Sequence, residues 1–120
     1  MSNTPAIQFY IGDWKRDTAL ARCSTSTRGV WFEILLAMHD DGACGKLCGK
    51  PVDFLRICRC TKAEFALACK ELRATETATV TRRNGSVTII NRRMQKEWKK
   101  RQDNAKRQRR HREKQKGDDE

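Results

Sequence analysis

The chain is short, strongly basic and without a long apolar segment. It has 120 residues, of which 26 are Lys or Arg and 15 are Asp or Glu, and its formal net charge is +11. No apolar run approaches the roughly 18 residues of a membrane span, and no secretory signal is visible at the N-terminus. We therefore expect a cytoplasmic protein with one domain and a tail, whose six cysteines are reduced thiols.

Aromatic residues gather near the N-terminus. Phe9, Tyr10 and Trp14 are bulky enough to anchor on a core. The Gly12-Asp13 pair between them is typical of a turn. We expect this segment to pack its rings on the domain around that turn.

The longest helix of the domain is predicted over residues 27–40. Ser24 or Ser26 is placed to cap its N-terminus, and Asp41-Gly42 to end it. The apolar residues recur at the spacing of one buried helix face. They are Trp31, Ile34, Leu35 and Met38.

A short helix is predicted to begin at Pro51. Proline suits the first helical position, since an N–H would have no partner there. Phe54, Leu55 and Cys58 then fall on one face of the helix.

A second helix follows after a tight turn. Thr61 and Glu64 have the spacing of a capping box, in which each residue's side chain bonds the other's backbone N–H. The apolar stripe of this helix consists of Phe65, Cys69 and Leu72, with Ala66 beside it.

A two-stranded hairpin comes next. Asn84-Gly85 is the preferred pair for a two-residue type I′ turn, because both positions need a positive φ. This turn places Arg83 opposite Ser86 and fixes the register. The apolar residues that then share one face are Val80, Val87 and Ile89. Residues 46–48 are predicted to join the hairpin as a third strand.

The C-terminal segment changes character along its length. Met94 and Trp98 are spaced to dock a helix on the domain. Residues 92–116 hold thirteen basic and three acidic residues, and nothing apolar follows Ala105. Such a segment cannot bury a face, so it is either a protruding helix or a disordered arm.

The order helix, short strand, helix, helix, hairpin predicts the fold class. It is α+β, mainly α, and of the winged helix-turn-helix type, with three helices and a small antiparallel wing. We assign the winged-helix domain to residues 1–98 and a basic C-terminal helix or arm to residues 99–120.

Two motifs resemble those of a family of small phage- and prophage-encoded proteins. These proteins begin with Phe-Tyr-x-Gly-Asp and end their core with Asn-x-Arg-x-x-x-Glu. The matching residues are Phe9, Tyr10, Gly12, Asp13, Asn91, Arg93 and Glu97. Some members look like the N-terminal winged-helix domain of phage replication initiators, or replisome organisers. The resemblance implies replication initiation in a bacterial host, replication proteins such as a helicase or its loader as partners, and no catalytic residues.

We predict that the chain binds double-stranded DNA. The helix that begins at Lys62 would enter the major groove, while the hairpin tip and the arm would hold phosphates. The predicted nucleic-acid-binding residues are Lys62, Lys70, Arg73, Arg82, Arg83, Asn84, Arg92, Arg93, Lys99, Lys100, Arg101, Lys106, Arg107, Arg109, Arg110 and Arg112. Two alternatives remain: a dimeric prophage transcription regulator, and an RNA-binding or assembly protein that uses the arm.

The sequence favours a non-enzyme without a metal or other cofactor. No nucleophile elbow, P-loop or dinucleotide-binding loop is present. His39-Asp40-Asp41 resembles a metal-hydrolase pair but fits the end of a helix better. Four thiols, those of Cys44, Cys48, Cys58 and Cys60, leave a zinc site as an alternative. Their spacing and apolar surroundings favour buried thiols instead.

Overall fold

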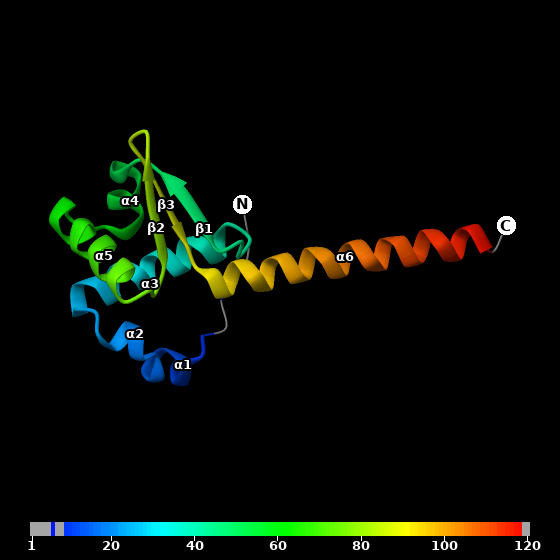
Figure 1. Ribbon diagram of the computed structural model, residues 1–120, viewed down its shortest axis with the longest axis horizontal. Helices are drawn as coiled ribbons and strands as arrows, with labels where there is room; N and C mark the ends of the chain where they lie inside the picture. Colours follow the sequence, from blue (N-terminus) through cyan, green and yellow to red (C-terminus); the bar gives the residue numbers. More distant parts are fainter. Residues whose placement is uncertain (1–5, 7–8, 119–120) are drawn as a thin grey trace.

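The structure is a computed structural model that describes residue 6 and residues 9–118. It is mainly helical, with a small three-stranded antiparallel sheet (Figure 1). The elements in chain order are α1 (Ile11–Arg16), α2 (Thr18–Ala21), α3 (Thr25–Asp40), β1 (Lys46–Gly49), α4 (Pro51–Cys58), α5 (Lys62–Ala74), β2 (Thr79–Arg83), β3 (Ser86–Ile90) and α6 (Arg92–Asp118).

Helix α3 runs through the middle of the folded body. The sheet and α5 lie on one side of it, and α1 and α2 lie on the other (Figure 1). Ser24 is its N-cap, as predicted, and accepts a hydrogen bond from the backbone N–H of Thr27 at 3.3 Å. The helix buries Trp31 and Ile34 as predicted, whereas Leu35 is only partly buried at the edge of the core.

The two shorter helices confirm the predicted turn between them. Pro51 is in the first turn of α4, and Arg59 ends the helix in the left-handed conformation at φ 52°. The capping box of α5 is formed: Glu64 N–H donates to the Thr61 hydroxyl at 3.1 Å, and Thr61 N–H donates to the Glu64 carboxylate at 2.9 Å.

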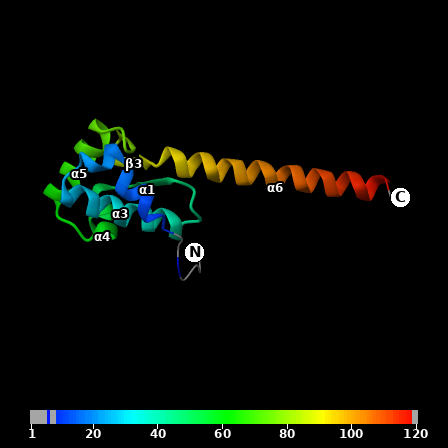
Figure 2. The same ribbon diagram turned by 90° about the horizontal axis from the view of Figure 1, so that it is seen from below.

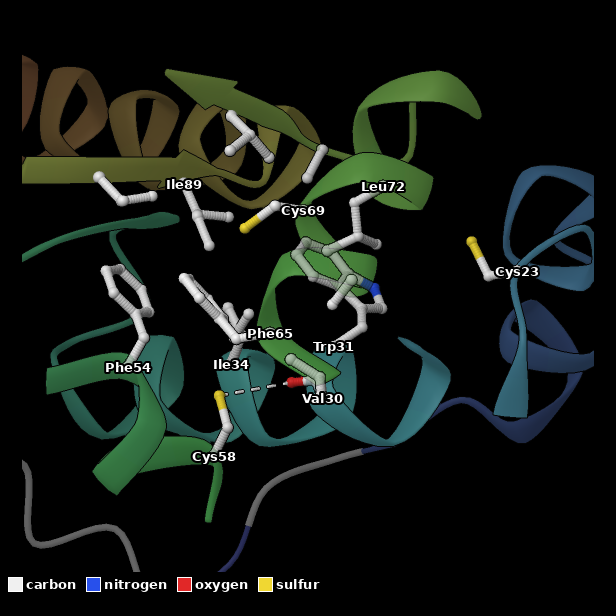
Figure 3. Packing of buried hydrophobic residues seen from close by; sticks show 14 of the residues in the cluster. Cys23, Val30, Trp31, Ile34, Phe54, Cys58, Phe65, Cys69, Leu72 and Ile89 are labelled. Atoms are coloured by element: carbon white, nitrogen blue, oxygen red, sulfur yellow. Dashed lines mark hydrogen bonds between the residues drawn. The ribbon is translucent and has the colours of Figure 1, made fainter. Parts of the chain in front are cut away.

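The buried face of α5 differs from the prediction at one position. Phe65, Cys69 and Leu72 are buried as expected, but Ala68 completes the face and Ala66 is exposed. Residue 68 follows Phe65 by three and precedes Leu72 by four, so it lies on the same side of the helix. Figure 3 shows Phe65, Cys69 and Leu72 pointing into the core.

The sheet has the strand order β1-β3-β2, and its register is the predicted one. Arg83 pairs with Ser86, and Asn84 and Gly85 have φ values of 52° and 77°, as a type I′ turn requires. The third strand, β1, pairs with β3. The residues of the inner face, all buried, are Val80, Val87 and Ile89.

The core joins all these elements. Ile34 of α3, Leu72 of α5 and Ile89 of β3 have no exposed surface. Phe54 of α4 stacks on Phe65 of α5 with their ring centroids 5.2 Å apart. Figure 3 shows these side chains pointing toward one another from α3, α4, α5 and β3.

The N-terminal prediction was wrong in two respects. Gly12 and Asp13 lie inside α1 and form no turn. Phe9 and Tyr10 are 40 % and 59 % exposed, so Trp14 is the better anchored of the three predicted aromatic residues. A glycine is tolerated in the first turn of a short helix, and an aspartate there is favoured by the helix dipole.

The C-terminal segment is a single helix, the first of its two predicted forms. Met94 is buried and Trp98 is partly buried, whereas every residue from 99 to 117 is exposed. The helix projects away from the body in both views (Figures 1 and 2). We call residues 99–117 the arm.

Backbone contact with β1 fixes the start of α6. Asn91 N–H donates to the carbonyl of Gly45 at 2.8 Å, and the Asn91 side chain accepts from the N–H of Met94 at 3.2 Å. Gly45 is buried, with φ 78°. A Cβ on Gly45 would clash with the backbone N of Gln95 and lie 2.9 Å from the carbonyl O of Asn91.

We predict that Gly45→Ala lowers the free energy of unfolding by about 3 kcal/mol, through left-handed backbone strain and backbone overlap together. Gly42→Ala is the matched control, because Gly42 has the same φ of 78° but no atom within 4 Å of its added Cβ. It should cost only about 1 kcal/mol. Urea unfolding of both variants measures the difference, and equal losses would contradict the close approach.

Side-chain hydrogen bonds join α5 to the start of α3. The Glu71 carboxylate accepts hydrogen bonds from the backbone N–H of Ser24 at 2.7 Å and from the Ser24 hydroxyl at 3.1 Å. Hydrogen bonds from the Thr27 hydroxyl and the Ser24 N–H lower the pKa of Glu71 below its ordinary value. The charged form of Glu71 therefore stabilises the fold.

We predict that Glu71→Gln makes the protein less stable at pH 7. Because the pKa is lower in the folded chain, the carboxylate contributes fully above its ordinary pKa of 4.5. That contribution disappears as the pH falls through the folded pKa, so variant and wild type should converge in acid. Urea unfolding across this range tests it, with the exposed Glu113→Gln as a control that changes neither stability nor its pH dependence.

Candidate nucleic-acid interface

The outward side of α5 carries three of the predicted basic residues. Lys62, Lys70 and Arg73 are all exposed. The rest of this side consists of small or apolar residues, which are Ala63, Ala66, Leu67 and Ala74. Base edges are read by side chains that donate or accept hydrogen bonds. Lysine and arginine donate to guanine edges as well as to phosphates, and alanine packs on thymine methyl groups, so this side of the helix is compatible with both kinds of contact.

The two hairpin arginines point to different sides of the sheet. Arg82 pairs with Val87 and follows Val80 by two residues, so it extends the inner face that packs on α5. Burial raises the pKa of the Cys69 thiol on α5, and the nearby Arg82 guanidinium limits that rise. Arg83 belongs to the opposite face. Both arginines are exposed, as is Asn84 at the tip.

We call the predicted basic side chains of α5 and the residues of the hairpin tip the body surface. It comprises Lys62, Lys70, Arg73, Arg82, Arg83 and Asn84. Helix α5 and β2 lie side by side within it, because the Arg73 guanidinium donates to the carbonyl of Val80 at 2.8 Å. That hydrogen bond leaves Arg73 exposed but fixes its position.

The arginines at the start of α6 are partly engaged by the protein itself. Arg92 donates to the carbonyl of Glu76. Arg93 forms ion pairs with Asp13 at 3.8 Å and with Glu97 at 3.4 Å. Two carboxylates therefore oppose the charge of Arg93, which makes it the weakest phosphate ligand of the predicted set.

The arm is basic on all its sides. Between residues 99 and 117 the only acidic residues are Asp103 and Glu113. The predicted site residues of the arm are all exposed: Lys99, Lys100, Arg101, Lys106, Arg107, Arg109, Arg110 and Arg112. At 1.5 Å per residue the arm is roughly 28 Å long. It extends away from α5 and the hairpin (Figure 1), so the predicted residues form two separate basic regions.

The structure gives no support to a zinc centre in the part of the chain it describes. There, no group of three or more His, Cys, Asp or Glu side chains is placed to hold a metal ion. Cys58 is buried, and its thiol donates to the carbonyl of Val30 at 3.8 Å (Figure 3). Burial, with smaller effects of Cys60 and Glu33, raises the pKa of Cys58 to about 12. Zinc binds the thiolate, so Cys58 is poorly suited to this role.

The remaining motif, His39-Asp40-Asp41, closes a helix as predicted. Helix α3 ends at Asp40, and Asp41 is its C-cap. Gly42 then continues in the left-handed conformation.

Sequence reasoning missed a groove between α1, α3 and the start of α6. Phe9, Tyr10 and Asp13 line it from one end of the chain, and Asn91, Arg93 and Glu97 line it from the other. These positions are distant in sequence, and Phe9 and Tyr10 were expected to anchor on the core. No local spacing signals such a groove, because α6 forms one wall only once it has docked beside β1.

Comparison with protein-family models, with curated proteins and with solved structures finds no match to this chain. Within the described residues, no helix has both the length and the apolar character needed to cross a bilayer.

We predict a large difference in thiol reactivity between Cys48 and Cys58. Cys48 is exposed, whereas the thiolate fraction of Cys58 is about a thousandfold below that of an ordinary thiol with pKa 9.0. Iodoacetamide at pH 8 should label Cys48 at least a hundredfold faster in the native protein. Peptide mass spectrometry measures both rates, and similar rates would contradict the burial of Cys58. Labelling in urea is the control, because unfolding should remove the difference.

Proposed function

We propose that the chain is a winged helix-turn-helix protein that binds double-stranded DNA. The chain order α3, β1, α4, α5, β2, β3 and the strand order β1-β3-β2 support this assignment. In this arrangement α5 is the helix presented to the duplex, and the β2–β3 hairpin is the wing beside it.

The observation that carries the proposal is the exposure of cationic groups in two regions. On the body surface, the basic side chains of α5 and the wing tip are all exposed. On the arm, arginine and lysine side chains extend on every side of a helix with no apolar face. An arrangement of this kind is the electrostatic footprint of a polyanion partner.

Most of the predicted cationic residues would contact phosphates, which give affinity rather than sequence choice. Any reading of base edges would come from Lys62, Lys70 and Arg73 of α5 or from the wing tip. The proposed role is phage replication initiation, with replication proteins as partners, and a dimeric transcription regulator is the alternative. The replication role itself rests on the two motifs at residues 9–13 and 91–97.

We predict a steep salt dependence. If about six phosphates are neutralised, log K for a duplex should fall with log salt at a slope near −5. Arg82→Ala/Arg83→Ala should make that slope about 2 units shallower, because two phosphate contacts are lost. Lys15→Ala/Arg16→Ala on α1, away from the body surface, is the charge-matched control and should leave the slope unchanged.

Fluorescence anisotropy with a labelled 20-base-pair duplex measures these slopes. A wild-type slope near zero would overturn the proposal. Deletion of residues 101–120 distinguishes the two regions, because the deleted residues the structure describes contribute no buried side chain. Binding that persists would assign duplex recognition to the body surface. Complete loss of binding would assign it to the arm and would favour the alternative, an RNA-binding or assembly protein.

A further inference from the structure

A groove of about 790 Å³ lies on the side of α3 away from α5 and the hairpin. Helix α1 forms one wall, the first turns of α6 form the opposite wall, and α3 lies beneath. The ion pair between Asp13 of α1 and Arg93 of α6 joins the two walls at 3.8 Å. This volume accommodates two or three bulky side chains.

Apolar surface is concentrated at this groove. Its floor includes Trp31, Leu35 and Met94. At its mouth, Phe9 is 40 % exposed and Tyr10 is 59 % exposed. Consecutive exposed apolar residues beside a concave surface are characteristic of a contact site for another molecule.

Contacts with two other aromatic rings hold Phe9 at the mouth of the groove. The ring centroid of Phe9 is 5.4 Å from that of Phe32 and 5.7 Å from that of Trp14. Phe9 is thus held from the α3 side and leaves part of its surface uncovered. The aromatic surface at the mouth is therefore preorganised, which lowers the entropic cost of binding.

Three carboxylates and three guanidinium groups line the groove, and they are not all paired with one another. Asp13 and Glu97 both pair with Arg93, and Asp17 accepts from the backbone N–H of Leu20 to cap α2. Among the described residues, Arg92 and Arg101 instead donate to carbonyl oxygens, those of Glu76 and Ala43, and neither forms an ion pair. The α6 wall therefore offers two guanidinium groups to the carboxylates of another molecule.

We propose that this groove docks a segment of a partner protein that combines bulky apolar side chains with carboxylates. An amphipathic helix of two or three turns fits: its apolar residues would cover Phe9 and Tyr10, and its Asp or Glu residues would reach Arg92 and Arg101. Aromatic residues and arginine are the side chains that dominate binding energy at protein interfaces. A phosphate backbone fits less well, because it has no bulky apolar group to cover Phe9 and Tyr10.

This inference goes beyond the proposed function and does not depend on it. The groove lies across α3 from the body surface, so the protein could hold DNA and a partner together. If the chain failed to bind duplex DNA, the groove proposal would be unaffected. If the groove bound no peptide, the proposed DNA binding would be unaffected.

The test is selection from a displayed library of random 16-residue peptides on the full chain. We expect selected peptides to combine Leu, Phe or Trp with Asp or Glu at helical spacing. Tyr10→Ser should weaken the best peptide at least tenfold. Arg101→Glu should also weaken it at least tenfold, and replacing the peptide's acidic residues by Lys should restore binding to that variant.

Matched controls are available on α4. Ile57 is 40 % exposed, and Arg56 on the same helix is also exposed, away from the groove. Ile57→Ser and Arg56→Glu should leave peptide affinity unchanged. Thermal unfolding of all four variants verifies that each is folded, as expected for exposed positions.

Several outcomes would overturn the proposal. They are the selection of no peptide, the selection of basic peptides, or peptide affinity that Tyr10→Ser and Arg101→Glu leave unchanged. Binding of a labelled 16-nucleotide oligothymidine that Tyr10→Ser abolishes would assign the groove to single-stranded nucleic acid. Sedimentation showing self-association that Tyr10→Ser abolishes would assign it to a second copy of the chain.

Discussion

The contact between the inner face of the sheet and the α3–α5 pair determines most of this structure. Val80, Val87 and Ile89 are buried against the two helices. Side chains of a strand alternate between faces, so a slip of one residue could replace these apolar side chains with Thr79, Ser86 and Thr88. The two-residue turn at Asn84-Gly85 prevents that slip. The same alternation directs Arg82 toward α5 and Arg83 away from it, so core packing also arranges the charges of the hairpin.

The position of α6 relative to the folded body depends on the contacts at the start of this helix. Gly45 allows the backbone of β1 to approach Asn91 closely, and Asn91 in turn caps α6. This junction sets the direction of the arm and brings Arg92 and Arg93 beside α1. The arm of the proposed DNA-binding region and one wall of the proposed docking groove thus belong to a single helix.

Much of the fold could be predicted from the sequence because its signals are local. A capping box, a proline at a helix start and an Asn-Gly turn each depend on residues within one turn of chain, and Thr61, Pro51 and Asn84 behave as predicted. The apolar spacing of the helices and the hairpin together identified most of the core. Buried residues outside those patterns, such as Leu20 and Cys23, show the limit of this reasoning, because their burial depends on how α2 and the following loop pack on the rest of the chain.

The candidate sites were less predictable, because they depend on contacts between distant segments. The exposure of Lys62, Lys70, Arg82 and Arg83 agrees with the sequence prediction, but their partners could not be inferred. The ion pairs of Arg93 join residues from both ends of the folded body. Phe9 and Tyr10 are as apolar as core residues, and their exposure follows from where α6 docks. The helical form of the arm could not be distinguished from disorder, since it has no apolar face to reveal a period.

A continuous α6 has a mechanical consequence. An unstructured linker of the same composition would let body and tail find anionic sites independently, over a broad range of separations. A stiff helix whose first turn is embedded in the body holds those separations nearly constant. Each bound molecule would then occupy a stretch of duplex of defined length and polarity. Neighbouring molecules on the duplex would be spaced by steric exclusion. A force applied to the C-terminal end of α6 would be transmitted along the helix to its junction with the folded body.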